Sequence, residues 1–272
     1  MDRTLVVEKT AEQAQWWAAQ RIQKLKEFSS ENISINPFLL PLIMELHGYE
    51  SSEDLVSFMM GGHLSTSHAT GFGKLIDEKI LPNVFNTIKL NKEYRSRNIY
   101  KNSIFDEIDH IVPRLNNDVY LLSLKAGRWT IQLTMAVQLN KSFAEIIELK
   151  NKNLINFNKI IIGVFYGNTD NLTDKYRIAR GICTGAVHDV VDIRSNVDVL
   201  CGKDFWSWLN YGEQDTQLWV MEGLLQGTKY EIDKYDIKNI IGTYKQKFNE
   251  NLNKYMINGS INWRELINDI NS

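Results

Sequence analysis

The chain is poor in cysteine and proline, and it has no long uninterrupted hydrophobic stretch. Its 272 residues include two cysteines, Cys183 and Cys201, and four prolines. Two cysteines cannot form a disulfide framework, and their spacing fits neither a metal site nor a redox motif, which is typical of a reducing cytoplasm. No apolar run approaches the ~20 residues that span a bilayer, and the first ten residues lack the apolar core of a signal peptide. We therefore predict a cytoplasmic protein with no membrane partner.

An excess of charge of one sign is also missing, because the formal net charge is −2 at pH 7. This balance excludes a globally basic nucleic-acid coat, so any contact with DNA must come from a local basic surface. Neither a G-x-x-x-x-G-K-[ST] loop nor a convincing dinucleotide fingerprint occurs, which leaves an ATPase or a dehydrogenase unsupported. The length is that of one large domain or two modest ones, with an ordinary globular composition.

What is present is an acidic patch followed by an apolar strand that ends in a lysine. Asp109 stands in the acidic patch, a turn-rich run follows, and the apolar segment Val119–Leu124 leads into Lys125. If the two segments pair as a β-hairpin, Asp109 and Lys125 lie at the same end of it, since facing residues on paired strands sit about 5 Å apart. Such a pair suits metal-assisted phosphodiester hydrolysis, in which the carboxylate holds a divalent cation and the lysine orients or activates the attacking water.

This stretch resembles the active-site hairpin of the PD-(D/E)xK nucleases, the superfamily of most type II restriction endonucleases. Asp109 matches the first aspartate of the motif, and Ser123, Leu124 and Lys125 match its (D/E)xK triplet. Ile108 stands where the motif has proline, and Ser123 stands where it has an acid. The resemblance implies catalytic positions at Asp109, Ser123 and Lys125. It also implies a Mg²⁺ ion held by Asp109 and by the main-chain carbonyl of Leu124.

The acid that Ser123 replaces could come from elsewhere in the chain, and Glu107 and Glu78 are the candidates. In the resembled superfamily a helix ahead of the hairpin often lends an extra acid, and Glu78 lies on a predicted helix of this kind. The alternative for Glu78 is a solvated i,i+4 pair with Lys74. The missing acid also keeps open a protein of another class, which binds DNA through a degenerate nuclease fold and performs no chemistry.

A second nuclease interpretation starts from the same residues. The segment Asp109–Pro113 looks like the D-H-I-x-P segment of HNH endonucleases, in which His110 would be the general base. No histidine occurs between His110 and His188, and there is no C-x-x-C pair to brace such a small fold. An HNH nuclease is therefore the alternative function.

Two basic stretches are candidates for DNA contact. Residues 89–101, just ahead of the acidic patch, are predicted to contact phosphates, since Lys and Arg neutralise the polyanion. The loop-rich residues 167–181 are predicted to project arginines that read guanine bidentately. A solvated loop and surface ion pairs are the respective alternatives. The predicted DNA-binding residues are Arg95, Arg97, Lys101, Lys175, Arg177 and Arg180.

The remaining pattern predicts an α/β protein with a PD-(D/E)xK-type mixed sheet core flanked by helical regions. A helical segment, Ile131–Lys150, followed by the apolar run Lys159–Phe165 indicates a right-handed βαβ crossover with parallel strands. A later strand running into G-K-x-F-W also looks like the region after the catalytic core in many type II restriction enzymes. We predict a helical region at 1–92, a nuclease core at 93–209, and a helical region at 210–272 that packs with the first and takes part in dimerisation.

Local signals set the expected helix ends in the outer regions. Thr10 is expected to cap the first helix, and Asn36-Pro37 to start the second. Gly61-Gly62 is expected to end the third helix, and a fourth is expected to end before Pro82. A turn is expected near Gly227.

As a whole the chain is similar to type II restriction endonucleases, and the nearest family by this resemblance is that of the enzyme cutting the interrupted palindrome RGGNCCY. The resemblance implies Mg²⁺-dependent cleavage of double-stranded DNA. It also implies a homodimer, because a two-fold target is matched by a two-fold protein.

Overall fold

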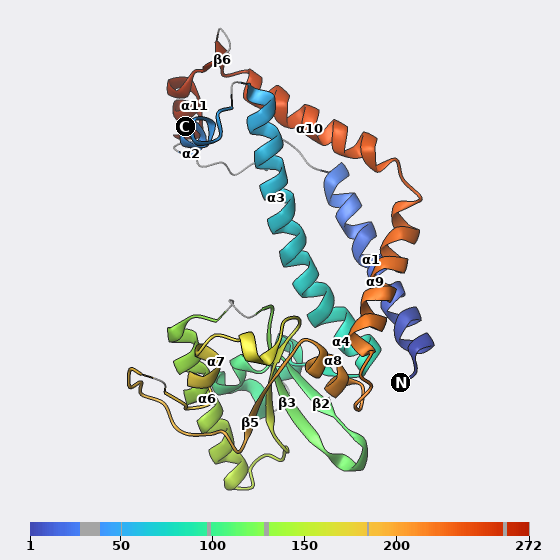
Figure 1. Ribbon diagram of the computed structural model, residues 1–272, viewed down its shortest axis with the longest axis vertical. Coiled ribbons are helices and arrows are strands. Elements are labelled where there is room, and N and C mark those ends of the chain that lie inside the picture. Colours follow the sequence, from blue (N-terminus) through green and yellow to red (C-terminus); the bar gives the residue numbers. More distant parts are fainter. Residues whose placement is uncertain are drawn as a thin grey trace. The chain divides into compact units, whose positions relative to one another are not determined.

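The computed structural model describes residues 1–27, 39–49, 51–96, 99–127, 131–183, 185–257 and 260–271. Over these ranges the chain is a mixed α/β protein that divides into two compact units (Figure 1). The first unit combines residues 1–13 with 73–226, and the second combines 14–72 with 227–272. The predicted core at 93–209 lies inside the first unit, which extends further in both directions.

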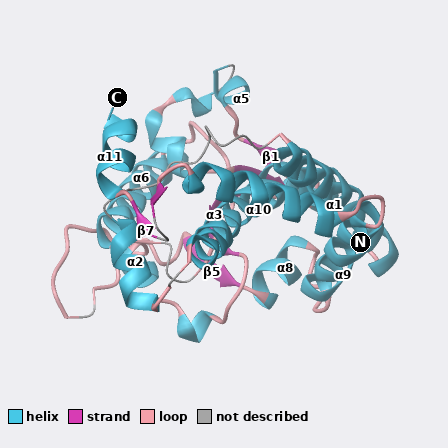
Figure 2. Ribbon diagram, turned by 90° about the horizontal axis from the view of Figure 1, so that it is seen from above, coloured by secondary structure: helices cyan, strands magenta, loops and turns pink. Residues whose placement is uncertain are grey.

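The first unit is built on a mixed sheet with the strand order β1-β2-β3-β4-β5. Strands β1, β2 and β3 are antiparallel neighbours, whereas β4 and β5 continue the sheet parallel to β3. Their bounds are β1 (Ile88–Lys89), β2 (His110–Pro113), β3 (Val119–Lys125), β4 (Ile160–Val164) and β5 (Val197–Cys201). Strands are a small part of a largely helical chain, as Figure 2 shows.

The predicted hairpin is confirmed in β2 and β3. His110 lies opposite Leu122 and Pro113 lies opposite Val119. The turn between the strands carries Asn116 and Asn117 at φ angles of 66° and 63°. Asparagine accepts this left-handed conformation more readily than most residues, so the turn-rich run closes the hairpin where the sequence indicated.

The predicted βαβ crossover is also confirmed. Helix α6 (Leu133–Asn151) joins β3 to the parallel strand β4, and Lys125 lies opposite Val164. Every residue of β4 is buried, because helices cover both faces of the sheet. Helix α6 lies against one face of the sheet (Figure 1). Its residues Phe143 and Ile146 belong to the core cluster that contains Ile160.

Helix α8 (Lys203–Leu209) follows β5 and packs on the other face of the sheet. A Cβ atom at Gly163 would lie 2.4 Å from the Phe205 ring, so only glycine allows this close approach. Trp206 of the same helix lies 5.9 Å from Phe85, measured between ring centroids. The first unit therefore encloses its sheet between α6 and α8.

Short helical segments complete the first unit. They are the π-helical turn η2 (Ile76–Ile80), α4 (Leu81–Phe85), α5 (Lys92–Ser96), η3 (Ile99–Lys101), η4 (Ser103–Glu107), η5 (Leu115–Asn117), η6 (Thr169–Asn171) and α7 (Lys175–Ile178).

The second unit is formed by helices from both ends of the chain. Leu40 and Leu55 share one hydrophobic cluster with Tyr244, Phe248 and Leu252. The elements are α2 (Leu39–His47), α3 (Ser52–Leu75) as far as Phe72, α10 (Ile237–Asn253), β6 (Met256–Ile257), β7 (Ser260–Ile261) and α11 (Trp263–Asn271). Residues 14–26 and 227–232, which belong to helices shared with the first unit, complete it. None of the helices in the described parts of the chain is long and apolar enough to cross a membrane.

Several expected helix ends are wrong. Helix α1 (Arg3–Lys26) begins well before Thr10, which is buried within the helix and does not cap it. Helix α3 runs through Gly61-Gly62 and continues through η2 into α4, which contains Pro82. Likewise α9 (Thr216–Ile232) runs through Gly227. A helical glycine costs only about 1 kcal/mol, which cooperative continuation of a long helix outweighs. The expected start at Asn36-Pro37 lies outside the described residues.

Candidate active site at the end of the hairpin

Asp109 lies one residue before β2, at the end of the hairpin where β3 reaches Lys125. Its Oδ2 accepts a hydrogen bond of 2.6 Å from the N–H of Leu124. Its own N–H donates to the carbonyl of Leu122 at 2.8 Å. If the β2–β3 register is continued by one residue, Asp109 lies opposite Ser123. The structure therefore brings the predicted aspartate and the predicted triplet to one end of the hairpin.

Lys125 points toward the second predicted acid. Its side chain is mostly buried, and its Nζ lies 4.0 Å from Oε2 of Glu107 at the end of η4. Glu107 is therefore placed beside the lysine of the motif. Glu107 and Asp109 are two residues apart in the stretch that leads from η4 into β2.

Ser123 occupies the acid position of the motif but lies in the core. The residue is completely buried, and its Oγ has no hydrogen-bond partner within the part of the chain that the structure describes. It lies on the face of β3 that also presents Leu121 to the α6 core. A neutral, fully enclosed hydroxyl cannot supply the missing carboxylate, so a direct catalytic role for Ser123 is not supported.

Of the two acids in the preceding helical turn, Asp77 contacts the hairpin and Glu78 does not. Asp77 lies in the π-helical turn η2, and its Oδ1 lies 2.7 Å from Nε2 of His110. Glu78 is exposed. A π turn holds one residue more than an α-helical turn, which changes the direction of the side chains it contains. No signal in the sequence marks this turn, and the carboxylate that contacts the hairpin is one residue from the predicted one.

Asp77 is ionised at neutral pH. Burial alone would raise the pKa of its carboxyl, but the hydrogen bonds from His110 and Lys89 outweigh burial and hold that pKa below its ordinary value. A charged, partly enclosed carboxylate therefore faces the hairpin from the helical side.

His110 is buried and links Thr87 to Asp77. It is 0% exposed, its Nδ1 lies 2.9 Å from Oγ1 of Thr87, and its Nε2 contacts Asp77. A neutral imidazole satisfies both contacts if the Thr87 hydroxyl donates to Nδ1 and Nε2–H donates to the carboxylate. Neither nitrogen is open to water. The HNH alternative requires His110 to act on a water molecule, and this geometry does not support it.

Lys89 lies between two carboxylates. Its Nζ is 2.6 Å from each carboxylate oxygen of Asp77 and 3.7 Å from Oδ1 of Asp109. A chain of hydrogen-bonded groups thus runs from Thr87 through His110 and Asp77 to Lys89, whose ammonium then approaches Asp109. The sequence predicted that Lys89 belongs to a phosphate-binding stretch. In the structure its ammonium instead contacts the carboxylate of Asp77.

Arg95 is likewise used internally. Its guanidinium donates to the main-chain carbonyls of Leu90, Phe105 and Ile108 at 2.8, 2.6 and 2.6 Å. These carbonyls belong to the segments that lead into β2. Arg95 therefore braces the approach to Asp109, and its predicted phosphate contact is not supported.

The other predicted DNA contacts differ in exposure. Lys101 and Arg177 are exposed, and Arg180 is half-buried. The ammonium of Lys175 lies 2.6 Å from the carboxylate of the preceding residue. Arg97 lies outside the described residues. Lys101 and Arg177 are therefore the candidates most open to a DNA strand.

Asp109 is the residue best placed to hold Mg²⁺. Its Oδ1 makes no hydrogen bond within the described ranges, and the side chain is 30% exposed. Mg²⁺ prefers oxygen ligands, keeps several waters and is often bound through one or two carboxylates, so this carboxylate fits it. No group of three or more His, Cys, Asp or Glu side chains suited to a metal ion occurs among the residues that the structure describes.

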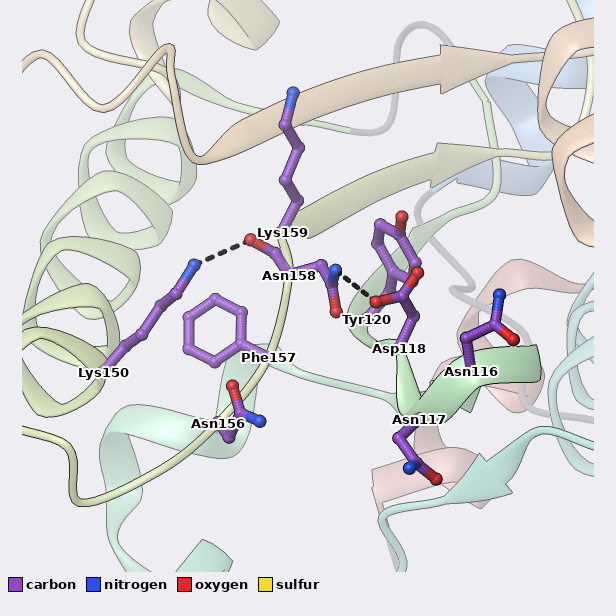
Figure 3. Close-up of a pocket in the computed structure, with 9 residues that line it drawn as sticks. All are labelled: Asn116, Asn117, Asp118, Tyr120, Lys150, Asn156, Phe157, Asn158 and Lys159. Atoms are coloured by element: carbon purple, nitrogen blue, oxygen red, sulfur yellow. Dashed lines mark hydrogen bonds between the residues drawn. The ribbon is translucent and has the colours of Figure 1, made fainter.

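The opposite end of β3 and β4 carries a polar hollow of about 610 Å³. In this hollow Lys150 donates to the carbonyl of Asn158, and the Asn158 amide donates to Asp118, both at 2.8 Å (Figure 3). The residues that line it are Asn116, Asn117, Asp118, Tyr120, Lys150, Asn156, Phe157, Asn158 and Lys159. Several of its polar groups already bond to one another, and the hollow lies at the end of β3 remote from Asp109.

Comparison with models of known protein families finds no match, and a search of curated proteins finds no significant match.

Proposed function

We propose that the protein is a Mg²⁺-dependent, sequence-specific double-stranded DNA endonuclease of the type II restriction class. The observation that carries this proposal is the fixing of Asp109 by the N–H of Leu124, which holds a partly exposed carboxylate at the end of β3. The next residue of that strand is Lys125. A carboxylate and a lysine held by one rigid hairpin are the groups that metal-assisted phosphodiester hydrolysis requires.

The surrounding fold supports the proposal. The mixed sheet joins an antiparallel hairpin to a parallel crossover, and helices cover both of its faces. The resemblance to the PD-(D/E)xK nucleases implies a mixed sheet with flanking helices. The carboxyl ends of the parallel strands β3 and β4 lie at the same edge as Asp109, and in open α/β sheets that edge is where ligands bind.

The roles of the side chains follow from their surroundings. Mg²⁺, when bound, would polarise a phosphoryl oxygen and lower the pKa of its water. Asp109 would hold the ion through Oδ1. Lys125, whose Nζ lies 4.0 Å from Glu107, would orient the attacking water or stabilise negative charge on the phosphoryl group. Lys101 and Arg177 would contact the DNA. We propose a homodimer acting in the cytoplasm, because a palindromic target requires two-fold symmetry.

The test is incubation of the purified protein with supercoiled plasmid DNA, with Mg²⁺ and then with excess EDTA. Discrete linear fragments that require Mg²⁺ are expected. Lys125→Ala should lower the cleavage rate by about 10²–10³-fold and leave DNA binding nearly unchanged, since the lysine acts on the reacting groups and not on base edges. Lys159→Ala, at the other end of β4, is the control. Equal rates for wild type and Lys125→Ala would remove Lys125 from the mechanism.

A second candidate is a DNA-binding protein without catalytic activity. The observation that favours it is the buried, neutral Ser123 at the acid position. The same experiment separates the two functions. Retarded plasmid with no cleavage at any Mg²⁺ or Mn²⁺ concentration would support binding alone.

A further inference from the structure

Lys89 and Asp109 approach each other without forming a close ion pair. Their 3.7 Å separation exceeds the roughly 2.7–2.9 Å of a charge-assisted hydrogen bond. A movement of Nζ by about 1 Å would close the gap. Two opposite, partly enclosed charges attract each other, so their own interaction does not explain this separation. Another group must therefore hold the ammonium of Lys89 back.

Asp77 is that group. Both of its oxygens lie 2.6 Å from Nζ of Lys89, which makes it the dominant partner of the ammonium. Asp77 is fixed in turn by the fully buried His110, whose other nitrogen contacts Thr87. Its main chain belongs to the π-helical turn. Lys89 is therefore held by a carboxylate that a fully buried histidine fixes.

The separation between Lys89 and Asp109 determines which ligands Asp109 can bind. Its Oδ2 already accepts the N–H of Leu124, so Oδ1 is the oxygen left for a ligand. A direct contact from Lys89 would occupy Oδ1 and place a positive charge where a divalent cation has to bind. Like charges at such a distance repel strongly in a partly desolvated site.

We propose that Asp77 is a positioning residue that holds Lys89 away from Asp109 and thereby keeps Oδ1 open for a divalent cation. The inference rests on the proposed function of Asp109 as a metal ligand. His110 and Thr87 act through Asp77 by fixing its carboxylate.

The experiment measures Mn²⁺ binding directly, by calorimetry and electron paramagnetic resonance, beside plasmid cleavage. The variants are Asp77→Asn, Lys89→Met and the double variant. Asp198→Asn is the matched control, because Asp198 forms a 2.8 Å pair with Lys159 at the opposite end of the sheet. Thermal unfolding of every variant checks that it is folded.

Asp77→Asn is expected to weaken Mn²⁺ binding by about 10–100-fold, the usual effect of removing a group that orients a metal ligand. Adding Lys89→Met should recover most of that loss, because the competing ammonium is gone. Lys89→Met alone should bind Mn²⁺ at least as tightly as wild type. Asp198→Asn should have no effect. A purely structural role for Asp77 would show no recovery in the double variant.

Three results would overturn the inference. A double variant as weak as Asp77→Asn would show that Asp77 itself ligates the metal or only supports the fold. Normal Mn²⁺ binding by Asp77→Asn would show that Lys89 does not compete. If Asp77→Asn does not fold, Lys89→Met alone tests the inference. Weaker Mn²⁺ binding by Lys89→Met than by wild type would then show that Lys89 does not compete.

The proposed nuclease function can be rejected separately from the positioning role of Asp77. Mn²⁺ binding that follows the expected pattern, with no cleavage by any variant, would keep the positioning role and reject the nuclease. No Mn²⁺ binding by the wild type would reject both.

Discussion

The two ends of the mixed sheet carry the same types of residue in different surroundings. At the end that holds Asp109, the pair of Lys89 and Asp77 is 24% and 26% exposed and is backed by a buried histidine. At the other end, the pair of Lys159 and Asp198 is 41% and 36% exposed. Exposed pairs contribute about 0–1 kcal/mol to stability and fix little. The two pairs contain the same residue types. Burial and a third partner, the histidine, distinguish the positioned pair from the solvated one.

The sharpest test of this comparison replaces one aspartate at each end. Asp109→Ala should lower plasmid cleavage by about 10³-fold, since it removes the proposed metal ligand. Asp118→Ala, which removes a carboxylate bonded to an asparagine amide in the polar hollow, should leave cleavage unchanged. The rates are measured with Mg²⁺ in excess. Equal losses at both ends would mean that the two carboxylates do not differ in function.

Stability provides the second test. His110→Ala leaves a cavity and two partners without their hydrogen bonds, so it should lower the free energy of unfolding by about 2–4 kcal/mol. Asn158→Ala, in the polar hollow, should cost about 1 kcal/mol, because water replaces the lost amide contacts. Urea denaturation measures both values. A smaller cost for His110→Ala than for Asn158→Ala would show that the chain of polar groups is loosely held.

DNA binding provides the third test, because the residues proposed to contact DNA, Lys101 and Arg177, do not line the polar hollow. Arg177→Ala should reduce the preference for the cleaved sequence over an unrelated duplex by about 1–3 kcal/mol. Lys101→Ala should weaken binding to both duplexes and reduce the salt slope by about 1. Lys150→Ala, in the polar hollow, is the control. Equal losses on both duplexes for Arg177→Ala would place base recognition elsewhere in the chain.

The smallest effect concerns pH. The pKa of Asp77 is held below its ordinary value of 3.8, so its pairing stabilises the folded protein above that pH. The contribution is lost as the pH falls through the lower pKa of the folded state. The advantage of wild type over Asp77→Asn, on the order of 1 kcal/mol, should be constant from pH 7 to 5 and shrink below pH 4. Urea denaturation at each pH measures this difference, and an advantage that grows with acidity would contradict the assignment.

The sequence predicted those parts of the core that depend on local pattern. The apolar run before Lys125 and the apolar strand Ile160–Val164 are signals of strands, and the helix between them requires parallel pairing. The hairpin then places Asp109 with Lys125. These features follow from residue types that lie close together along the chain.

The rest of the site depends on contacts that residue types do not specify. Asp77 and His110 are 33 positions apart, and a π turn selects Asp77 over its neighbour Glu78. Arg95 and Lys89 look like solvent-facing charges in a basic stretch, yet carbonyls and a carboxylate bind them inside the protein. Composition describes such residues only as basic, so it cannot show which of them already contact other groups of the protein.

The π turn also decides how this region tolerates changes in chain length. A π turn is an α-helical turn with one residue inserted, and each residue of an α-helix advances the side chains by about 100°. Deleting a single residue within Ile76–Ile80 would give a more regular helix and turn the carboxylate of residue 77 away from His110. The deletion would make the helix more regular. It would nevertheless disturb this site more than most single side-chain replacements.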